Sequence, residues 1–250
     1  MMKKLIIFDL DGTLAESKQP LTHEMALYLS KLLVVTRVGI ISGGALSQFL
    51  KQVVSQLPVD TKLAHLYLLP TSGSALYEFR NDAWKKIYEE RLSEKEKDTI
   101  ETAMRAAAEE TGIIDFSENA YGERIEYRGG QVTLSALGQQ APLPLKKAWD
   151  PKHTKRHALQ ENIAVRLPVF SVGIGGATSI DVTKRGVDKA YGIRKLCERT
   201  NVQESEALYI GDELESGGND EAVYKTRAAT CTVTDPADTL RTIKTILSAA

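Results

Sequence analysis

Residues 4–13 read KLIIFDLDGT, and this stretch decides the fold. Its first half, 4–8, is a short and nearly continuous apolar run, which is typical of a strand buried on both faces in a parallel sheet. Asp9 and Asp11 follow at the carboxyl end of this run, where open α/β sheets bind their ligands. Two carboxylates spaced two residues apart point to the same side while the backbone stays extended. The stretch therefore predicts the first strand of an α/β fold that ends in an acidic site.

Residues 9–13 also suggest a specific chemistry. Asp9 is placed to attack an electrophile, while Asp11 serves as acid and base. Gly12 lets the chain turn sharply, and Thr13 offers a hydroxyl and an amide to an oxyanion. Two alternatives stay open, a plain acidic turn after a strand and a calcium-binding loop. The calcium loop fits less well, because its glycine belongs at the sixth position rather than the fourth and it ends in a glutamate.

Alternating strands and helices surround this stretch at both ends of the chain. In the first third, the predicted strands are 38–41 and 66–69 and the predicted helices are 22–33 and 45–57. In the last part, the predicted strands are 207–210 and 229–233, and the predicted helices are 188–199 and one that Asp235 and Pro236 open. Short strand–helix–strand links predict right-handed crossovers and a parallel sheet. Both parts are therefore expected to form one open sheet.

Residues 84–182 break this alternation. They contain one long predicted helix at 93–111, which a capping box of Ser93 and Glu96 opens and Gly112 closes. Strand-like runs lie around it at 125–127, 131–136, 165–172 and 178–182. Strands with one or two helices predict an α+β domain with an antiparallel sheet. We expect a core domain formed by residues 1–82 and 185–250, with a second domain, 83–184, inserted after its third strand.

Three further elements place polar groups at the ends of predicted core strands or at helix starts. Ser42, followed by Gly43, offers a hydroxyl and exposed amides that suit a phosphate. Lys189 lies in the first turn of a helix, an unfavourable place for a cation unless it is needed elsewhere. Asp212 follows strand 207–210, and Asp220 ends a GGND sequence shortly after it. Each element alone also fits an ordinary turn, solvated lysine or flexible loop, but together they predict a site at one sheet edge.

Composition excludes several classes of protein. The chain has 250 residues, with 32 Lys+Arg against 33 Asp+Glu and a formal net charge of −1, which argues against a nucleic-acid or anionic-membrane partner. No apolar run approaches the roughly 18 residues of a spanning helix, and the first one ends at Asp9, too short for a secretory signal. Cys197 and Cys231 fit no metal or disulfide spacing. We expect a soluble, cytoplasmic protein.

The motifs resemble a known family. Residues 9–13, Ser42, Lys189 and Asp212 match, in order and kind, the four motifs of the haloacid-dehalogenase-like phosphotransferases. Further stretches are similar to the eukaryotic-type phosphomannomutase branch, at 126–130, 135–138, 175–182, 186–189 and 211–220. The resemblance covers nearly the whole chain. It implies a Rossmann-like core with a parallel sheet and an inserted α+β cap domain with an antiparallel sheet.

The resemblance also implies a mechanism. A Mg²⁺ ion would be held by Asp9, the backbone carbonyl of Asp11 and Asp212, with Asp220 supporting it, and oxygen-only ligation suits this ion. Asp9 would form an aspartyl-phosphate, Asp11 would donate and accept the proton, and Lys189 would stabilise charge.

The substrate contacts implied by the resemblance lie in both domains. In the core they are Thr13, Lys18, Ser42 and Gly43, with Lys18 standing where the family usually has an arginine. In the cap they are Arg128, Ser179 and Asp181, with Asp181 receiving sugar hydroxyls. Ordinary polar residues at strand ends remain the alternative for the cap positions.

Two departures from the mutase branch bear on the acceptor. Gln139 stands where that branch has a basic residue, and a second arginine has no clear match among residues 142–149. Those arginines would hold the phosphate that is not being transferred, and glutamine does not replace a bidentate arginine. The other cap cations either compensate or form a solvated face: Lys146, Lys147, Lys152, Lys155 and Arg156.

These observations favour a sugar-phosphate phosphohydrolase. The first alternative is a phosphomannomutase that interconverts mannose 1-phosphate and mannose 6-phosphate, and the second is a non-catalytic sugar-phosphate-binding protein. His153 and His157 are spaced as zinc ligands on a helix would be, but no third partner accompanies them. The mutase branch further implies a homodimer formed through the cap.

Overall fold

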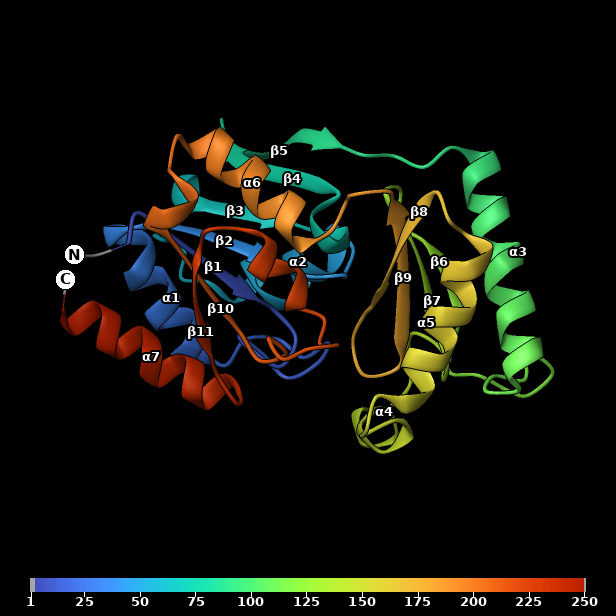
Figure 1. The fold of residues 1–250 in the computed structure, drawn as a ribbon. Helices are drawn as coiled ribbons and strands as arrows, with labels where there is room; N and C mark the ends of the chain where they lie inside the picture. The colour runs from blue at the N-terminus through green and yellow to red at the C-terminus, as the bar shows by residue number, and fades with distance from the viewer. Residues whose placement is uncertain (1–2, 250) are drawn as a thin grey trace. The chain divides into compact units, whose positions relative to one another are not determined.

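The computed structural model describes residues 3–249, and the chain divides into two compact units. The first unit contains the described residues up to Glu89 and those from Lys189 onward, and the second is Glu90–Asp188. Figure 1 shows that each unit has its own sheet with its own helices. Within residues 3–249, no helix combines the length and the apolar character needed to cross a membrane.

A seven-stranded sheet forms the centre of the first unit. Its strands, in sequence order, are β1 (Leu5–Asp9), β2 (Arg37–Ile41), β3 (Leu66–Leu69), β4 (Ala75–Arg80), β5 (Ala83–Glu89), β10 (Ala207–Gly211) and β11 (Ala229–Thr232). Their spatial order is β11-β10-β1-β2-β3-β4-β5, and the pairs from β11 to β3 are parallel. Every residue of β1 is buried. The predicted α/β core with a parallel sheet is confirmed, and β1 lies between two parallel neighbours.

Helices cover both faces of this sheet. They are α1 (His23–Val35), α2 (Leu46–Gln52), α6 (Lys189–Thr200) and α7 (Pro236–Ser248). Figure 1 shows α1 and α7 on one face and α6 on the other. The side chain of Asp235 caps α7, as predicted. The predicted helix 45–57 is shorter in the structure, because α2 ends at Gln52 and a separate 3₁₀ turn, Val54–Gln56, follows it.

The first unit also contains a β-hairpin that the sequence analysis does not predict. β4 and β5 pair antiparallel at the edge of the seven-stranded sheet, although residues 83–89 are expected in the inserted domain. Asn81 and Asp82 join the two strands with φ values of 50° and 55°. Such two-residue turns with positive φ match the twist of a hairpin and favour Asn and Asp. The Asn-Asp pair therefore marks the hairpin in the sequence.

The second unit has a four-stranded antiparallel sheet, in the order β6-β7-β9-β8. Its strands are β6 (Ile125–Tyr127), β7 (Gln131–Ser135), β8 (Phe170–Ile174) and β9 (Ser179–Lys184). Its helices are α3 (Glu94–Thr111), α4 (Leu143–Trp149) and α5 (Thr154–Arg166). The α+β architecture and the capping box of α3 are confirmed. The predicted strand 165–172 is wrong at its start, because Arg166 still belongs to α5.

Strand alternation gives this second sheet two different faces. The apolar face packs under α3 and α5 through Val132, Leu134, Ile180 and Val182. The opposite face, which we call the polar face, consists of Glu126, Arg128, Gln131, Thr133, Ser135, Ser179, Asp181 and Thr183. Polar residues therefore gather on the side of the sheet away from the helices.

We propose that residues 90–188 form an independent domain, because they are contiguous in sequence and bury their own apolar cluster. Expressed alone, they should unfold in one cooperative thermal transition, measured by circular dichroism. The fragment 83–184 is the matched comparison. It carries β5 without its partner β4 and lacks Val187, whose carbonyl accepts a hydrogen bond from Thr183. It should be less stable, and a non-cooperative 90–188 fragment would contradict the proposal.

Candidate active site

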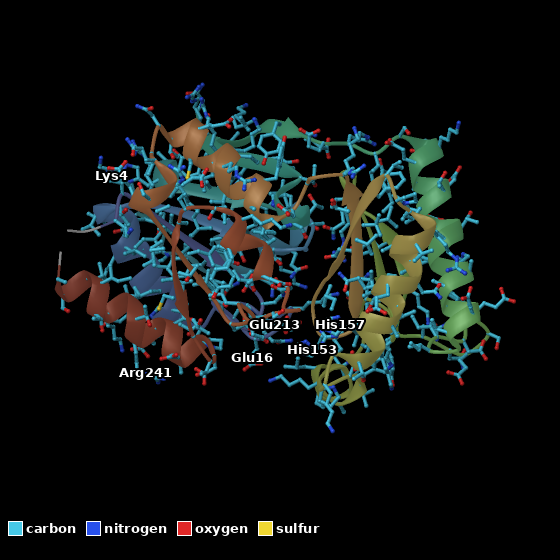
Figure 2. All side chains as sticks on the ribbon, in the orientation of Figure 1. Lys4, Glu16, His153, His157, Glu213 and Arg241 are labelled. Carbon is cyan, nitrogen blue, oxygen red and sulfur yellow. The ribbon has the colours of Figure 1, made fainter. Side chains whose placement is uncertain are left out.

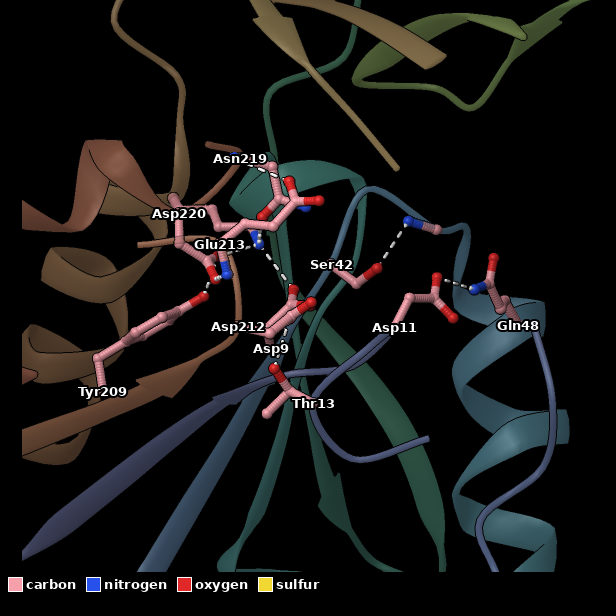
Figure 3. A network of polar contacts seen from close by, with 12 residues as sticks. Asp9, Asp11, Thr13, Ser42, Gln48, Tyr209, Asp212, Glu213, Asn219 and Asp220 are labelled. Carbon is pink, nitrogen blue, oxygen red and sulfur yellow. Dashed lines mark hydrogen bonds and ion pairs between the residues drawn. The ribbon is translucent and has the colours of Figure 1, made fainter. Parts of the chain in front are cut away.

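Three parallel strands of the first unit end at the same edge of its sheet and carry polar side chains there. Asp9 is the last residue of β1, Ser42 follows β2, and Asp212 follows β10. The register pairs Asp9 with Ile41, so Ser42 lies beside the end of β1. Figure 3 shows these side chains above the ends of the strands. The structure thus brings together site residues from three distant parts of the sequence.

Lys189 connects the cluster through its ammonium group. Its side chain is buried, and Nζ donates to Asp9 Oδ1 at 2.6 Å and to Asp220 Oδ1 at 2.5 Å. It also donates to Asn219 Oδ1 at 2.8 Å. Lys189 is the first residue of α6, where the helix dipole disfavours a cation. The two carboxylates offset that unfavourable position.

A group of three carboxylates lies around this ammonium. Asp9, Asp212 and Asp220 each offer an oxygen, and these oxygens lie within 4.8 Å of one another. Three carboxylates with one lysine leave an excess of two negative charges when all are ionised. Mg²⁺ prefers oxygen ligands, and a divalent cation balances this excess. The donor set therefore fits Mg²⁺, and these are the side chains predicted as its ligands.

The electrostatics of the cluster favour binding of a cation. Burial raises the pKa of Asp9 well above its usual value, against the opposing effect of Lys189, and the neighbouring carboxylates raise it further. Burial also raises the pKa of Asp212, to about 6, although a hydrogen bond from Thr13 opposes the shift. Burial lowers the pKa of Lys189, but Asp220 and Asp9 outweigh it and keep the ammonium charged. A bound cation would relieve the repulsion among the carboxylates.

The loop after β1 is shaped to fit Asp212. Gly12 has φ of 94°, and a Cβ on it would lie 2.2 Å from Asp212 Oδ2, so only glycine fits. Thr13 is fully buried, and its hydroxyl donates to Asp212 Oδ1 at 2.7 Å. We expect this hydroxyl to bind a substrate oxyanion, and in the structure it donates to Asp212, a predicted metal ligand.

The remaining core residues of the predicted site lie around Asp11 and the β2 loop. Asp11 Oδ1 accepts a hydrogen bond from the backbone amide of Lys18 at 2.7 Å. Ser42 is buried, and its hydroxyl accepts from the amide of Gly44 at 3.3 Å (Figure 3). Gly43 lies between them in the same turn. Lys18 is exposed, and its backbone amide contacts Asp11.

Several residues that contact the predicted site residues were not predicted from the sequence motifs. The buried hydroxyl of Tyr209 donates to Asp220 Oδ1 at 2.5 Å, and Asn219 binds Lys189 as described. Burial, and then the charge of Asp220, raise the pKa of Tyr209 well above its ordinary value, so the phenol stays protonated. Gln48 donates to Asp11, as Figure 3 shows. Tyr209 alternates with Gly211 on β10, which is the one signal in the sequence that it shares a face with the site.

The predicted cap residues lie on the polar face of the second unit. Asp181 Oδ1 accepts a hydrogen bond from the Thr133 hydroxyl at 2.8 Å, and both side chains are buried. Ser179 begins β9 two residues earlier, on the same face. Arg128 is bound by two neighbours. Its Nε and Nη2 donate to Glu126 Oε2 at 3.0 and 2.6 Å, and Nη2 donates to Gln139 Oε1 at 3.0 Å.

Among the described residues, no third ligand accompanies the pair of His153 and His157. The rings of His153 and His157 lie 6.5 Å apart between centroids (Figure 2). Among residues 3–249, the group of side chains arranged to hold a metal ion is the carboxylate cluster of Asp9, Asp212 and Asp220.

Comparison of sequences gives one consistent family. The sequence model described as eukaryotic phosphomannomutase matches residues 25–249. The phosphomannomutase of Spinacia oleracea is 27% identical over 247 residues, covering 95% of this chain and 93% of that protein. The phosphomannomutase of Encephalitozoon cuniculi is 27% identical over 250 residues, covering 96% of this chain and 92% of that protein.

Comparison of structures supports the fold. An IMP-bound variant of the Plasmodium falciparum IMP-nucleotidase matches with a TM-score of 0.73 at 17% identity, over 100% of this chain and 68% of that one. A protein of Streptococcus mutans UA159 matches with a TM-score of 0.67 at 16% identity, over 98% of this chain and 99% of that one. At these identities the likeness establishes a shared fold and no shared substrate.

The raised pKa of Asp212 predicts a pH effect on stability. Its pKa is about 6 in the folded chain against a usual 3.8. The free energy of unfolding of metal-free protein therefore falls as the pH rises from about 4 to about 6, and it stays low above that range. That loss disappears as the pH falls from 7 through 6 toward 4. Asp212→Asn should remove it and stabilise metal-free protein at pH 7 by up to roughly 3 kcal/mol, measured by thermal unfolding with a chelator.

Addition of Mg²⁺ provides the second half of this test. Millimolar Mg²⁺ should raise the melting temperature of the unaltered protein but not that of Asp212→Asn. Asp60→Asn, an exposed carboxylate of the same unit, is the matched control and should keep the Mg²⁺ response. Equal stabilisation of both variants by Mg²⁺ would contradict the assignment of Asp212 as a ligand.

Proposed function

The chain belongs to the eukaryotic phosphomannomutase family of haloacid-dehalogenase-like phosphotransferases, and on this premise we propose that it transfers the phosphoryl group of a sugar phosphate to water through an aspartyl-phosphate. Water is proposed as the acceptor because Arg128 is paired with Glu126 in the second unit. Arg128 is the retained cap arginine of the predicted site, and its guanidinium already has an anionic partner.

The first half of the reaction uses Asp9 and Asp11. A carboxylate oxygen of Asp9 forms a bond to phosphorus while the bond from phosphorus to the sugar oxygen breaks. The departing oxygen takes the proton of the Asp11 carboxyl group. In the second half, water attacks the aspartyl-phosphate, its proton returns to Asp11, and the bond from phosphorus to Asp9 breaks. Inorganic phosphate leaves and both carboxyl groups regain their starting state.

Other groups of the first unit support this transfer electrostatically. Lys189 contacts Asp9 directly and offsets charge on the phosphoryl oxygens, while Ser42 and Gly43 provide a hydroxyl and a turn beside it. Asp9, Asp212 and Asp220 would hold a Mg²⁺ ion, which would supply positive charge to offset the phosphoryl oxygens as the anionic nucleophile approaches. Thr13 and Tyr209 keep two of these carboxylates in place through their hydroxyls.

The cap arginine of the predicted site is already paired with a carboxylate, which makes it less available to a second phosphate. A mutase must hold one phosphate while the other is transferred, which requires a strong cationic site. The Arg128 side chain is 8% exposed and paired with Glu126, and Gln139 accepts a further hydrogen bond from it. A hydrogen bond to a charged group contributes about 1.5–3 kcal/mol. A phosphate that binds Arg128 would therefore compete with the carboxylate of Glu126.

Three of the other cap cations have contacts within the second unit. Buried Lys146 donates to the carbonyl of Gln139 at 3.3 Å. Arg156 is buried against Asp150, with Nε 3.2 Å from Oδ2, and it joins the start of α5 to the rest of the unit. Lys155 lies over the ring of Trp149 at 5.1 Å. These contacts support a structural role for the three cations.

Phosphomannomutase is the second candidate, and the curated relatives favour it. The relatives named above carry that name and align with nearly the whole chain. Arg128 and Lys18 remain as cations at positions implied by the resemblance. A non-catalytic binding protein is the third candidate. The presence of Asp9, Asp11 and Lys189 together argues against it, because binding alone requires no nucleophile.

Removal of the nucleophile should abolish turnover. Asp9→Asn is expected to lower kcat by roughly 10⁴-fold or more, because an amide oxygen does not displace the sugar oxygen. Borohydride reduction of acid-quenched protein should convert Asp9 of the unaltered chain to homoserine, detected by mass spectrometry. Asp60→Asn serves as the control and should keep both activity and labelling. Activity that survives Asp9→Asn would contradict the aspartyl-phosphate.

The product decides between the two catalytic candidates. Incubation with mannose 1-phosphate and Mg²⁺ should release inorganic phosphate whether or not a hexose bisphosphate is added. Formation of mannose 6-phosphate that depends on the bisphosphate would identify a mutase instead. Binding without any turnover would identify the non-catalytic protein.

The pairing of Arg128 can be tested separately. Glu126→Gln removes the carboxylate that holds the guanidinium and should tighten binding of a hexose bisphosphate by about tenfold, which is about 1.4 kcal/mol. Arg128→Gln is the paired variant and should not gain affinity. Unchanged binding in Glu126→Gln, measured by calorimetry, would show that the pair does not limit affinity for a second phosphate.

A further inference from the structure

Asp11 is held by donors that come from outside the loop of residues 9–13. Gln48 Nε2 donates to Asp11 Oδ2 at 3.0 Å, and the amide of Lys18 donates to the other oxygen, Oδ1, at 2.7 Å. Gln52 Nε2 lies 3.4 Å from Oδ1 and donates to the carbonyl of Gln19 at 2.7 Å. Both oxygens of the Asp11 carboxylate therefore have a donor, and Figure 3 shows the contact with Gln48.

The helix α2 places these two glutamines together. Gln48 and Gln52 are four residues apart, so they lie one turn apart on the same face. Gln52 is 3% exposed, and its backbone carbonyl accepts from the amide of Leu21. This fixes the helix against the loop that follows Asp11. The face of α2 that carries Gln48 and Gln52 therefore lies against the Asp11 carboxylate.

Gly44 provides the space for the Gln48 side chain. A Cβ on Gly44 would lie 2.5 Å from Gln48 Oε1 and 3.1 Å from Nε2. The amide group thus lies across the α-carbon of Gly44, and any side chain there would displace it. Because the clash involves the far end of a flexible side chain, Gly44→Ala should fold but move Gln48 away from Asp11.

The chemistry of Asp11 explains why a neutral amide is suitable at this position. In the proposed reaction Asp11 must alternate between carboxylic acid and carboxylate. A lysine or arginine would form an ion pair and hold it as the carboxylate. An amide offers both a donor and an acceptor, so it can hydrogen-bond to either state of the carboxyl group. Gln48 orients the group without fixing its charge.

We propose that Gln48 is a positioning residue that aims the Asp11 carboxyl group at the leaving oxygen of the substrate. The inference rests on the proposed function and adds a residue to it. In the step concerned, the bond from phosphorus to the leaving oxygen breaks, the bond from phosphorus to Asp9 forms, and the proton of Asp11 passes to the leaving oxygen. A misplaced Asp11 slows this step only when the leaving oxygen needs that proton.

Two substrates with different leaving groups test the proposal. Mannose 1-phosphate leaves as a sugar alcohol, which requires protonation, whereas p-nitrophenyl phosphate leaves as a stable phenolate. The value of kcat/KM reports on the steps up to leaving-group departure. In Gln48→Ala, kcat/KM should fall about tenfold for mannose 1-phosphate and less than twofold for p-nitrophenyl phosphate. Gly44→Ala should show the same difference between the substrates.

Controls separate positioning from general damage. Gln56→Ala removes an exposed glutamine of the same segment and should change neither value. In an Asp11→Asn background, Gln48→Ala should add no further selectivity, since there is no proton left to aim. Equal losses for both substrates, or no loss for either, would overturn the proposal while leaving the proposed function in place. An unaltered protein that turns over neither substrate would overturn both.

Discussion

An excess of buried negative charge at the end of β1 is the constraint on which the first unit depends. Asp9 and Asp220 are almost completely buried, and Lys189 is the ammonium that binds both of them. Buried charges are costly unless they are paired and hydrogen-bonded. The hydroxyl of Tyr209 also donates to Asp220, and the hydroxyl of Thr13 donates to the third carboxylate, Asp212. What remains uncompensated is a divalent negative charge, so the interaction that weakens the metal-free fold is also the source of its affinity for a cation.

The strand-end part of this site could be predicted from sequence, and the reason is geometric. Parallel strands end at one edge, so acidic and hydroxyl residues that directly follow apolar runs must converge there. This reasoning found Asp9, Ser42 and Asp212 without coordinates. Lys189 was found by a different argument, since a lysine in the first turn of a helix needs an anionic partner. Both arguments need only the position of a residue along a strand or helix, and neither needs the direction in which its side chain points.

The contacts that could not be predicted depend on how a helix or strand is rotated about its own axis and on which neighbouring element it packs against. Gln48 reaches Asp11 only because of the helical phase of α2, a helix of 7 residues that is too short to show a clear apolar face. Tyr209 contacts Asp220 from one face of β10. In a strand buried on both faces, the alternation of Tyr209 with Gly211 is the one signal of that face. The Asn81–Asp82 turn marks the hairpin of β4 and β5 in the sequence, but it does not show which sheet the hairpin joins. Alternation indicates a strand but does not say which sheet accepts it as an edge.

At two positions near the predicted site residues, a glutamine amide makes a hydrogen bond without adding a charge. Gln48 donates through Nε2 to a carboxylate, and Gln139 accepts through Oε1 from Arg128. In each place a charged side chain would add a permanent charge, whereas the amide satisfies a hydrogen bond and adds none. Because Arg128 is also neutralised by Glu126, strong attraction for a phosphoryl group is concentrated in the first unit, at Lys189 and the carboxylates that fit Mg²⁺. The proposed function therefore assigns a dianionic phosphate one strong site rather than two. Under the proposed function, this asymmetry favours release of the dephosphorylated sugar over its rebinding for a second transfer.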